Sequence, residues 1–462
     1  MSAVAAHIPA ASRSERVRLA IVLAVGVLFV AGILLEIDAL NGTWYWRRPW
    51  RDSGFLHTAA LLALPLLPFA LALREIEHPR AAARSAWPAL LLLMIANLGF
   101  QLGGMLRHPQ GLAWLDAIVT SPNATSYFTD ARRIDDIATW LANFHLAGLE
   151  LHSSTHPPGP ILFYSAFIGM FGAAGAARAG GIALGAIATL AIPLLYAFGG
   201  LWSRDRRERL LSCAMYALMP AAVAFFPEFD QIYPVFAMLV ALTWIGALRG
   251  SPMQAVAFGA VVFAMTFFAW NLLAMLAFVG LYSLYFLRRE RGSVDAVRRV
   301  GAAAMSALAT FVLLEIALRL ATGYDAPRSL AHALAMQREQ AALIDRPWWA
   351  CVLLDPYDFL LGAGVLAAPL LAFFLVRARA DASRGREDVA LSLIGLATIL
   401  AVDLSGLLRA ETARVWLFLQ PFAIVPAARE LLPFGARGRL LVFALQWLIL
   451  VALLARLSFV DP

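Results

Sequence analysis

The chain is dominated by long apolar runs that alternate with shorter, arginine-rich polar segments. A transmembrane helix needs about 20 consecutive apolar residues, and fourteen runs reach or approach this length. The pattern therefore predicts an all-α polytopic membrane protein in which residues 1–462 form a single transmembrane domain. The runs cover residues 17–35, 55–73, 87–106, 161–176, 178–200, 210–226, 232–248, 252–269, 270–287, 300–320, 359–376, 389–408, 415–432 and 440–458.

The composition supports this interpretation and removes several others. Of the 462 residues, 61% are hydrophobic and 15% are charged, a balance that soluble domains could not bury. All 37 basic residues are arginine, so lysine chemistry is excluded and an anionic ligand would be bound by guanidinium groups. Because the arginines lie at the ends of apolar runs, the positive-inside rule explains them and no nucleic-acid partner is expected.

The arginine clusters set the expected orientation, because cytoplasmic loops carry an excess of arginine. If all fourteen runs crossed the membrane, the clusters after residue 200 would lie outside. We therefore expect the run 161–176, which follows Pro-Pro-Gly and ends in Gly172-Ala-Ala-Gly175, to stay at the interface. This leaves about 13 transmembrane helices and a cytoplasmic N-terminus. The clusters are Arg13/Arg16/Arg18, Arg74/Arg80/Arg84, Arg204/Arg206/Arg207/Arg209, Arg288/Arg289/Arg291/Arg298/Arg299, Arg377/Arg379/Arg384/Arg386 and Arg429/Arg437/Arg439.

Two long loops, 107–160 and 321–358, then fall on the outer face. The first is rich in ionisable groups, and its residues 134–149 have the amphipathic spacing of a helix that lies in the membrane interface. The second has a helical pattern from Ser329 to Leu343, which we expect to cover a groove. The chemistry of the protein is therefore expected on this face.

The first loop contains, in order, an acidic residue, Asp130, the expected interfacial helix, the sequence His156-Pro157-Pro158 and then an apolar run. This order resembles the first outer loop of the GT-C superfamily of integral-membrane glycosyltransferases, in particular the protein-O-mannosyltransferase-like branch. A second acidic outer turn, 226–234, also falls where that superfamily has one. The resemblance covers residues 85–290. The chain departs from the pattern in having Thr129 before Asp130, in place of an acidic pair, and no lysine after Pro-Pro.

The resemblance implies an inverting glycosyltransferase of the bacterial inner membrane, with its active site outside the cytoplasm. Nucleotide sugars are absent there, so the donor would be a polyprenyl-phosphate-linked sugar and the acceptor a lipid, a glycan or a protein. Membrane lipids are the other expected partners. Such a transfer needs a carboxylate base, which contributes about 10²- to 10⁴-fold, a cation that faces the leaving phosphate, and a groove for the polyprenyl chain.

Three acidic residues are candidates for this chemistry. Asp130 is the expected catalytic base, and its alternative role is to cap the interfacial helix. Glu228 and Asp230 lie in a turn fixed by Pro227 and Pro234, and an acidic pair beside a bilayer is costly enough to favour function. We expect this pair to bind substrate; a divalent metal or a helix cap are the alternatives, and no other cofactor is indicated.

His156 is expected to form a hydrogen bond with substrate, or otherwise to pack within the loop. A zinc site that combines it with His145 and His152 would need a continuous helix, which Pro157 and Pro158 prevent.

A late outer segment carries Arg409, Glu411 and Arg414 between the runs 389–408 and 415–432. Two arginines beside the membrane can clamp a lipid phosphate, a use that the resemblance also implies. The alternative is a salt-bridge network that joins helix ends.

The main alternative function is a transporter or lipid flippase, because Asn271, Glu315 and Asp403 fall within apolar runs. Transporters usually have inverted repeats and broken mid-span helices, and the sequence reveals neither. The concentration of polar groups in the outer loops favours an enzyme.

Overall fold

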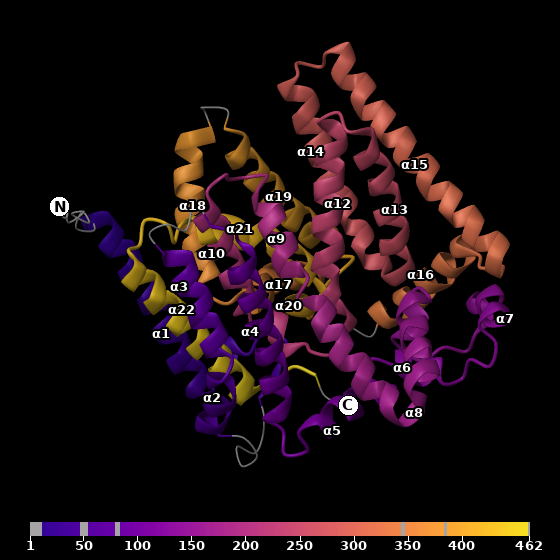
Figure 1. Ribbon diagram of the computed structural model, residues 1–462, viewed down its shortest axis with the longest axis horizontal. Coiled ribbons are helices and arrows are strands. Elements are labelled where there is room, and N and C mark those ends of the chain that lie inside the picture. Colours follow the sequence, from indigo (N-terminus) through magenta and orange to yellow (C-terminus); the bar gives the residue numbers. More distant parts are fainter. Residues whose placement is uncertain (1–11, 47–53, 79–83, 343–346, 383–385, 461–462) are drawn as a thin grey trace.

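The computed structural model describes residues 12–46, 54–78, 84–342, 347–382 and 386–460 (Figure 1). This part of the chain is almost entirely helical, as predicted; a short antiparallel pair joins β1 (Tyr45–Trp46) to β2 (Leu457–Ser458). The α-helices are α1 (Arg13–Leu34), α2 (Phe55–Ala63), α3 (Leu66–Glu77), α4 (Trp87–Leu106), α5 (Leu112–Thr120), α6 (Tyr127–Ala131), α7 (Ile137–Ala142), α8 (Gly159–Ala188), α9 (Ala191–Gly199), α10 (Arg206–Ala217), α11 (Ala221–Ala224), α12 (Tyr233–Leu248), α13 (Pro252–Phe268), α14 (Leu276–Arg289), α15 (Val294–Thr322), α16 (Ala326–Ala342), α17 (Trp348–Ala363), α18 (Ala367–Ala382), α19 (Glu387–Ser405), α20 (Thr412–Val415), α21 (Gln420–Arg429) and α22 (Ala436–Arg456). Short 3-10 helices are η1 (Asp38–Leu40), η3 (Phe144–Leu146), η4 (Ser153–Thr155), η5 (Phe229–Ile232), η6 (Trp270–Met275) and η7 (Leu417–Leu419).

The described chain contains 8 helices that are long and apolar enough to cross a membrane. The number rises to 10 if the bent pairs α2/α3 and α17/α18 each count as one span. The chain therefore has the character of a membrane protein, but the expected 13 spans are not confirmed. One reason is that several apolar runs are not single helices: run 210–226 is divided between α10 and α11, and run 415–432 among α20, η7 and α21.

The runs 161–176 and 178–200 belong to one candidate span, Gly159–Gly199, of 41 residues. Within it α8 is interrupted at Gly172, whose φ of 68° and ψ of 163° are not helical. Glycine adopts such a conformation without the steric cost that a Cβ would bring. The break falls inside the run that we expect to stay at the interface, and its failure to cross stays a prediction.

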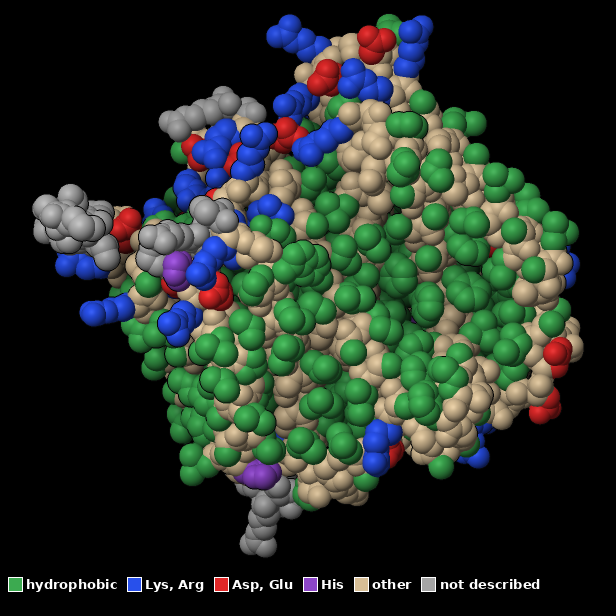
Figure 2. Space-filling model, in the orientation of Figure 1, with side chains coloured by type: hydrophobic (Ala, Val, Ile, Leu, Met, Phe, Trp, Pro, Cys, Tyr) green, Lys and Arg blue, Asp and Glu red, His purple; other side chains and the backbone are tan. Residues whose placement is uncertain are grey.

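Helix ends that carry arginine clusters meet along one edge of the molecule, which we call the arginine edge. Glu387, at the start of α19, pairs with Arg249 after α12 (3.0 Å) and with Arg289 at the end of α14 (2.6 Å). Glu430, after α21, pairs with Arg377 of α18 (2.6 Å). Figure 2 shows charged side chains gathered along the upper left of the molecule and a broad apolar face beside them.

The arginine edge gives the helices a common direction. The helices α12, α14 and α21 end there, whereas α1, α19 and α22 begin there. Their other ends lie toward the opposite side, where Figure 1 places α5, α7 and α16. The side of a membrane that the arginine edge faces stays a prediction. Of the cluster members, Arg80 and Arg384 lie outside the described residues.

The ion pair between buried Arg439 and half-buried Glu77 gives a test of this edge. The Arg439 guanidinium donates to both Glu77 carboxylate oxygens (2.6 Å each) and to the Leu432 carbonyl (3.1 Å). We expect Glu77→Ala to leave a buried charge unpaired, to cost about 3 kcal/mol and to lower the melting temperature in detergent. Arg298→Ala is the control, because Arg298 and Asp295 are exposed and 3.9 Å apart. Equal losses in the two variants would contradict the structural role of the pair.

Candidate active site

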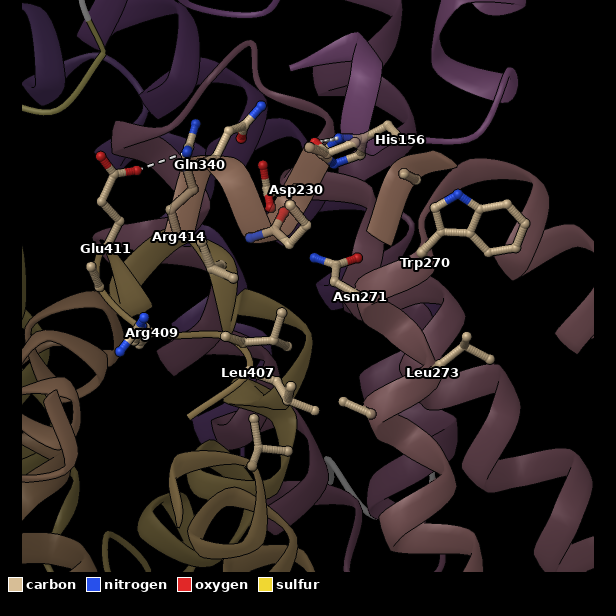
Figure 3. A pocket seen from close by; sticks show the side chains of 18 of the residues that line it. His156, Asp230, Trp270, Asn271, Leu273, Gln340, Leu407, Arg409, Glu411 and Arg414 are labelled. Carbon is tan, nitrogen blue, oxygen red and sulfur yellow. Dashed lines mark hydrogen bonds and ion pairs between the residues drawn. The ribbon is translucent and has the colours of Figure 1, made fainter. Parts of the chain in front are cut away.

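The described chain forms a cavity of about 940 Å³ at the end of the bundle away from the arginine edge (Figure 3). Its walls are formed by the first long loop, the turn before α12, the break between α13 and α14, and the segment from α19 to α20. The helix α16 covers the space between them. These segments are distant in the sequence. Of the residues expected at the site, the cavity brings together His156, Glu228, Asp230, Arg409, Glu411 and Arg414.

One wall of the cavity is formed by the loop 406–411 that precedes α20. Ala410 and Glu411 have positive φ angles, 64° and 49°, a conformation that is rare for residues with a Cβ and often found at functional sites. Bonds to α17 hold the loop in place: the Ala410 N–H donates to the Asp355 carboxylate (3.3 Å) and the Thr412 hydroxyl donates to the Asp355 carbonyl (2.6 Å). The two arginines of this wall are thereby fixed beside the cavity.

Arg414 lies among the carboxylates of the site. Its Nη2 is 2.7 Å from Glu411 Oε2, and its Nη1 is 3.9 Å from Glu228 Oε1. Burial lowers the pKa of Arg414, but the carboxylates of Glu411, Asp230 and Glu228 outweigh burial and raise it overall. The guanidinium therefore stays charged, and it is positioned to attract an anionic ligand.

The two acidic residues of the turn before α12 have different surroundings. Glu228 is buried, and within the described chain its Oε1 has no hydrogen-bond partner. Burial raises the pKa of Glu228 to about 8, although Arg414 opposes the shift. Asp230, in η5, is less enclosed, and Figure 3 shows it between Arg414 and Asn271. Neighbouring carboxylates in different environments are suited to different roles.

The loop before α8 contributes two uncharged histidines. Burial lowers the pKa of His152 and of His156 to about 4, so both are neutral at pH 7. His156 Nδ1 lies 2.8 Å from the His152 carbonyl, which leaves Nε2 as the nitrogen that can meet a substrate. Tyr127 packs edge-on against His156 and Phe229, with ring centroids 5.5 and 5.4 Å away, and so positions the imidazole.

Gly159 sets the distance between this loop and the end of α13. A Cβ on Gly159 would lie 2.3 Å from the Phe267 carbonyl oxygen, so only glycine permits this approach of the two backbones. The contact holds His156 on the side of the cavity that Trp270 and Asn271 line.

The wall opposite the arginines begins where the chain leaves α13. Ala269 is extended (φ −161°, ψ 121°), and η6 starts with Trp270 and Asn271. Trp270 Nε1 and Asn271 Oδ1 are buried and, among the described residues, have no hydrogen-bond partner. Unpaired buried polar atoms are rare enough in proteins to need an explanation. Figure 3 shows both residues across the cavity from Arg409 and Arg414.

The rest of the cavity is largely apolar. Leu273 and Ala277 line it from η6 and α14, and Ala401 and Val402 line it from α19, which packs against α14. The space between these two membrane helices can accept a hydrocarbon chain.

The helix α16 covers the cavity through a face that includes Leu334 and Gln337. It is connected to the first long loop, because Gln340 Nε2 donates to the Leu151 carbonyl (2.9 Å). The expected helix 329–343 is thus observed from residue 326 to 342.

Asp130 is not among the described residues that line the cavity, contrary to the expectation for the base. It is buried, and its two oxygens accept hydrogen bonds from the Arg133 guanidinium (3.0 Å) and the Glu150 N–H (3.1 Å). It also does not cap the interfacial helix; Asp136 caps α7, accepting from the Thr139 N–H (2.7 Å). The helix α7 covers only residues 137–142, whereas the amphipathic pattern predicted a helix over residues 134–149. Asp130 instead holds the loop that carries the two histidines.

A metal site is not supported by the arrangement of side chains. In the part of the chain that the structure describes, no group of three or more histidine, cysteine, aspartate or glutamate side chains is placed to hold a metal ion. Glu228 and Asp230 instead lie beside Arg414, whose charge partly opposes the rise that burial causes in the pKa of Glu228.

Comparison with known proteins does not place the chain in a family, because no family model and no curated protein matches it. The interpretation of the cavity therefore depends on the residues described above.

Sequence analysis did not assign Tyr127, Trp270 or Asn271 to the site, although all three line the cavity. The sequence could have indicated Asn271 as a site residue, because its amide interrupts an otherwise apolar run. It could not have indicated Tyr127 or Trp270, since aromatic residues are common at membrane interfaces.

The raised pKa of Glu228 predicts a pH-dependent stability. Because this pKa rises from 4.5 to about 8, the folded protein keeps a proton over a range in which the unfolded chain has released it. The stability contributed by Glu228 therefore falls as the pH rises from 4.5 to 8 and is constant above pH 8. We expect Glu228→Gln to melt at an increasingly higher temperature than the natural protein across this range. A difference that is independent of pH would contradict the raised pKa.

Proposed function

We propose that this protein is a GT-C-type membrane glycosyltransferase that moves a sugar from a polyprenyl-phosphate donor to an acceptor hydroxyl. The observation that carries the proposal is one cavity in which arginines and carboxylates adjoin an apolar space between two membrane helices. A polyprenyl-phosphate sugar has the matching parts: an anionic phosphate, a polar sugar and a hydrocarbon chain.

In this proposal, Arg409 and Arg414 bind the donor phosphate and neutralise the charge that develops as it leaves. Glu411 and Glu228 orient Arg414, which they contact at 2.7 and 3.9 Å. The first isoprene units lie between α14 and α19, against side chains such as Ala277.

We assign the base to Asp230 rather than to Asp130. Asp230 lines the cavity beside Arg414, whereas Asp130 is engaged elsewhere. Glu228 is less suited to the role, because with a pKa of about 8 it is largely protonated at pH 7. The acceptor oxygen attacks the anomeric carbon and transfers its proton to Asp230. The bond between the anomeric carbon and the phosphate oxygen breaks, and polyprenyl phosphate leaves with the electron pair, which inverts the configuration.

The proposal places the cavity on the outer side of a bacterial inner membrane and the N-terminus in the cytoplasm. It is supported by the separation of the cavity from the arginine edge, because arginine-rich helix ends favour the cytoplasm. The acceptor is a lipid, a glycan or a protein.

A transporter or flippase would need a passage that also opens at the arginine edge. Ion pairs join the helix ends there, including Arg429 with Asp388 (2.6 Å) and Glu387 with Arg289 (2.6 Å). These contacts favour an enzyme that works from one side.

Lipid retention tests the donor assignment. We expect the protein purified in mild detergent to retain polyprenyl phosphate or its sugar conjugate, and Arg414→Gln to reduce the amount roughly tenfold. The measurement is mass spectrometry of the co-purified lipids. Arg178→Gln is the matched control, because Arg178 pairs with Asp116 and neither residue lines the described cavity. A natural protein that retains no such lipid from membranes containing it would argue against the proposed donor.

Transfer assays on two variants test the base. We expect Asp230→Asn to lower transfer about 10²- to 10⁴-fold while the protein still binds donor lipid. Asp130→Asn should retain most of its turnover and lose thermal stability, since its role here is to hold a loop. The assay follows radiolabelled sugar from polyprenyl phosphate into acceptor. The reverse pattern would return the base to Asp130.

A further inference from the structure

We propose that Trp270 and Asn271 form the subsite for the sugar that is transferred, and that this sugar is uncharged. The inference rests on the proposed function, because it concerns the same cavity and the same donor. It adds a specificity wall to a site otherwise defined by charged residues.

The position of the subsite follows from the geometry of the cavity. Arg409 and Arg414 occupy one wall, Trp270 and Asn271 occupy the opposite wall, and Figure 3 shows Asp230 between them. A phosphate held by the arginines directs its attached sugar across the cavity toward η6. The anomeric carbon is then close to Asp230, and the remaining hydroxyl groups reach the far wall.

The chemistry of this wall suits hydroxyl groups. Figure 3 shows the amide of Asn271 between Asp230 and Trp270, with its nitrogen on the side of Asp230 and its oxygen on the side of Trp270. Within the described chain, Trp270 Nε1 and Asn271 Oδ1 have no hydrogen-bond partner, although both are buried. A buried polar atom without a partner is unfavourable, so a ligand that supplies the partner is favoured. Sugar hydroxyl groups, which donate and accept, can meet both atoms with small side-chain rotations.

The same wall lacks the charges that a charged sugar would need. Its lining residues are Trp270, Asn271, Leu273, Ala274 and Ala277, and none of them is ionisable. A uronic acid would place its carboxylate against this wall near Asp230, while Arg409 and Arg414 are engaged by the phosphate. Arg338, which also lines the described cavity, belongs to α16 and not to this wall. A carboxylate buried without a cation is strongly disfavoured.

Packing holds the wall in place. Phe268, which precedes the break, stacks on Phe229 with ring centroids 6.3 Å apart. It also packs against Phe236 in a tilted arrangement, with ring centroids 5.9 Å apart. The contact of Gly159 with the Phe267 backbone fixes the same segment from the other side. A subsite built on such a supported backbone discriminates well, because the backbone cannot easily shift to accommodate a wrong ligand.

The test compares two probes in nanodiscs: polyprenyl monophosphate, and the same lipid phosphate carrying a neutral hexose. We expect the natural protein to bind both, and Asn271→Leu and Trp270→Phe to weaken binding of the hexose lipid roughly tenfold without changing binding of the monophosphate. The retained monophosphate binding also shows that each variant is folded. Trp114→Phe and Asn143→Leu are matched controls, because neither residue lines the described cavity.

The outcomes separate the two proposals. If the natural protein fails to bind the monophosphate, the proposed function is wrong, and this inference falls with it. If it binds both probes and the variants bind the hexose lipid unchanged, only the subsite is wrong. A third probe that carries a hexuronate should bind roughly tenfold more weakly than the hexose lipid, and equal binding would overturn the claim that the sugar is uncharged.

Discussion

The charge of an arginine side chain beside a bilayer must be neutralised, and this requirement determines the arrangement of side chains at both the arginine edge and the cavity. Where water is scarce, an ionised group is tolerated only with partners. At the arginine edge the partners are internal: Arg289 and Arg377, among others, pair with carboxylates of neighbouring helices. In the cavity, Glu228, Trp270 and Asn271 keep buried polar atoms that have no hydrogen-bond partner among the described residues. The cavity, unlike the arginine edge, has room in which a ligand can meet such atoms.

The broad organisation could be predicted from the sequence because it depends on local properties. Apolar runs of membrane thickness identified the helical class, and clustered arginines identified helix ends that share one edge. Few polar residues lie at the borders of the apolar runs. Six of those that we selected there line one cavity: His156, Glu228, Asp230, Arg409, Glu411 and Arg414. The physical basis of these predictions is the free-energy cost of placing polar groups in lipid.

The remaining features depend on contacts between distant segments. Asp130 accepts hydrogen bonds from Arg133 and from the Glu150 N–H, and no sequence pattern reveals that these contacts hold it outside the lining of the described cavity. The run 210–226 is divided between α10 and α11, so the length of the run did not predict whether it crosses the membrane. The position of Trp270 depends on an extended Ala269 and on packing around Phe268.

The pairing of early and late helices has a consequence for biosynthesis. The helix α1 packs against α22, Glu36 pairs with Arg456 (2.8 Å), and Glu77 pairs with Arg439 (2.6 Å). During translation, both glutamates enter the membrane hundreds of residues before their arginines leave the ribosome. Until then these acids lack the arginine partners that they have in the folded chain. A chain that stops before α22 therefore lacks both ion pairs and the packing partner of α1, so the bundle closes only when its last helix has been made.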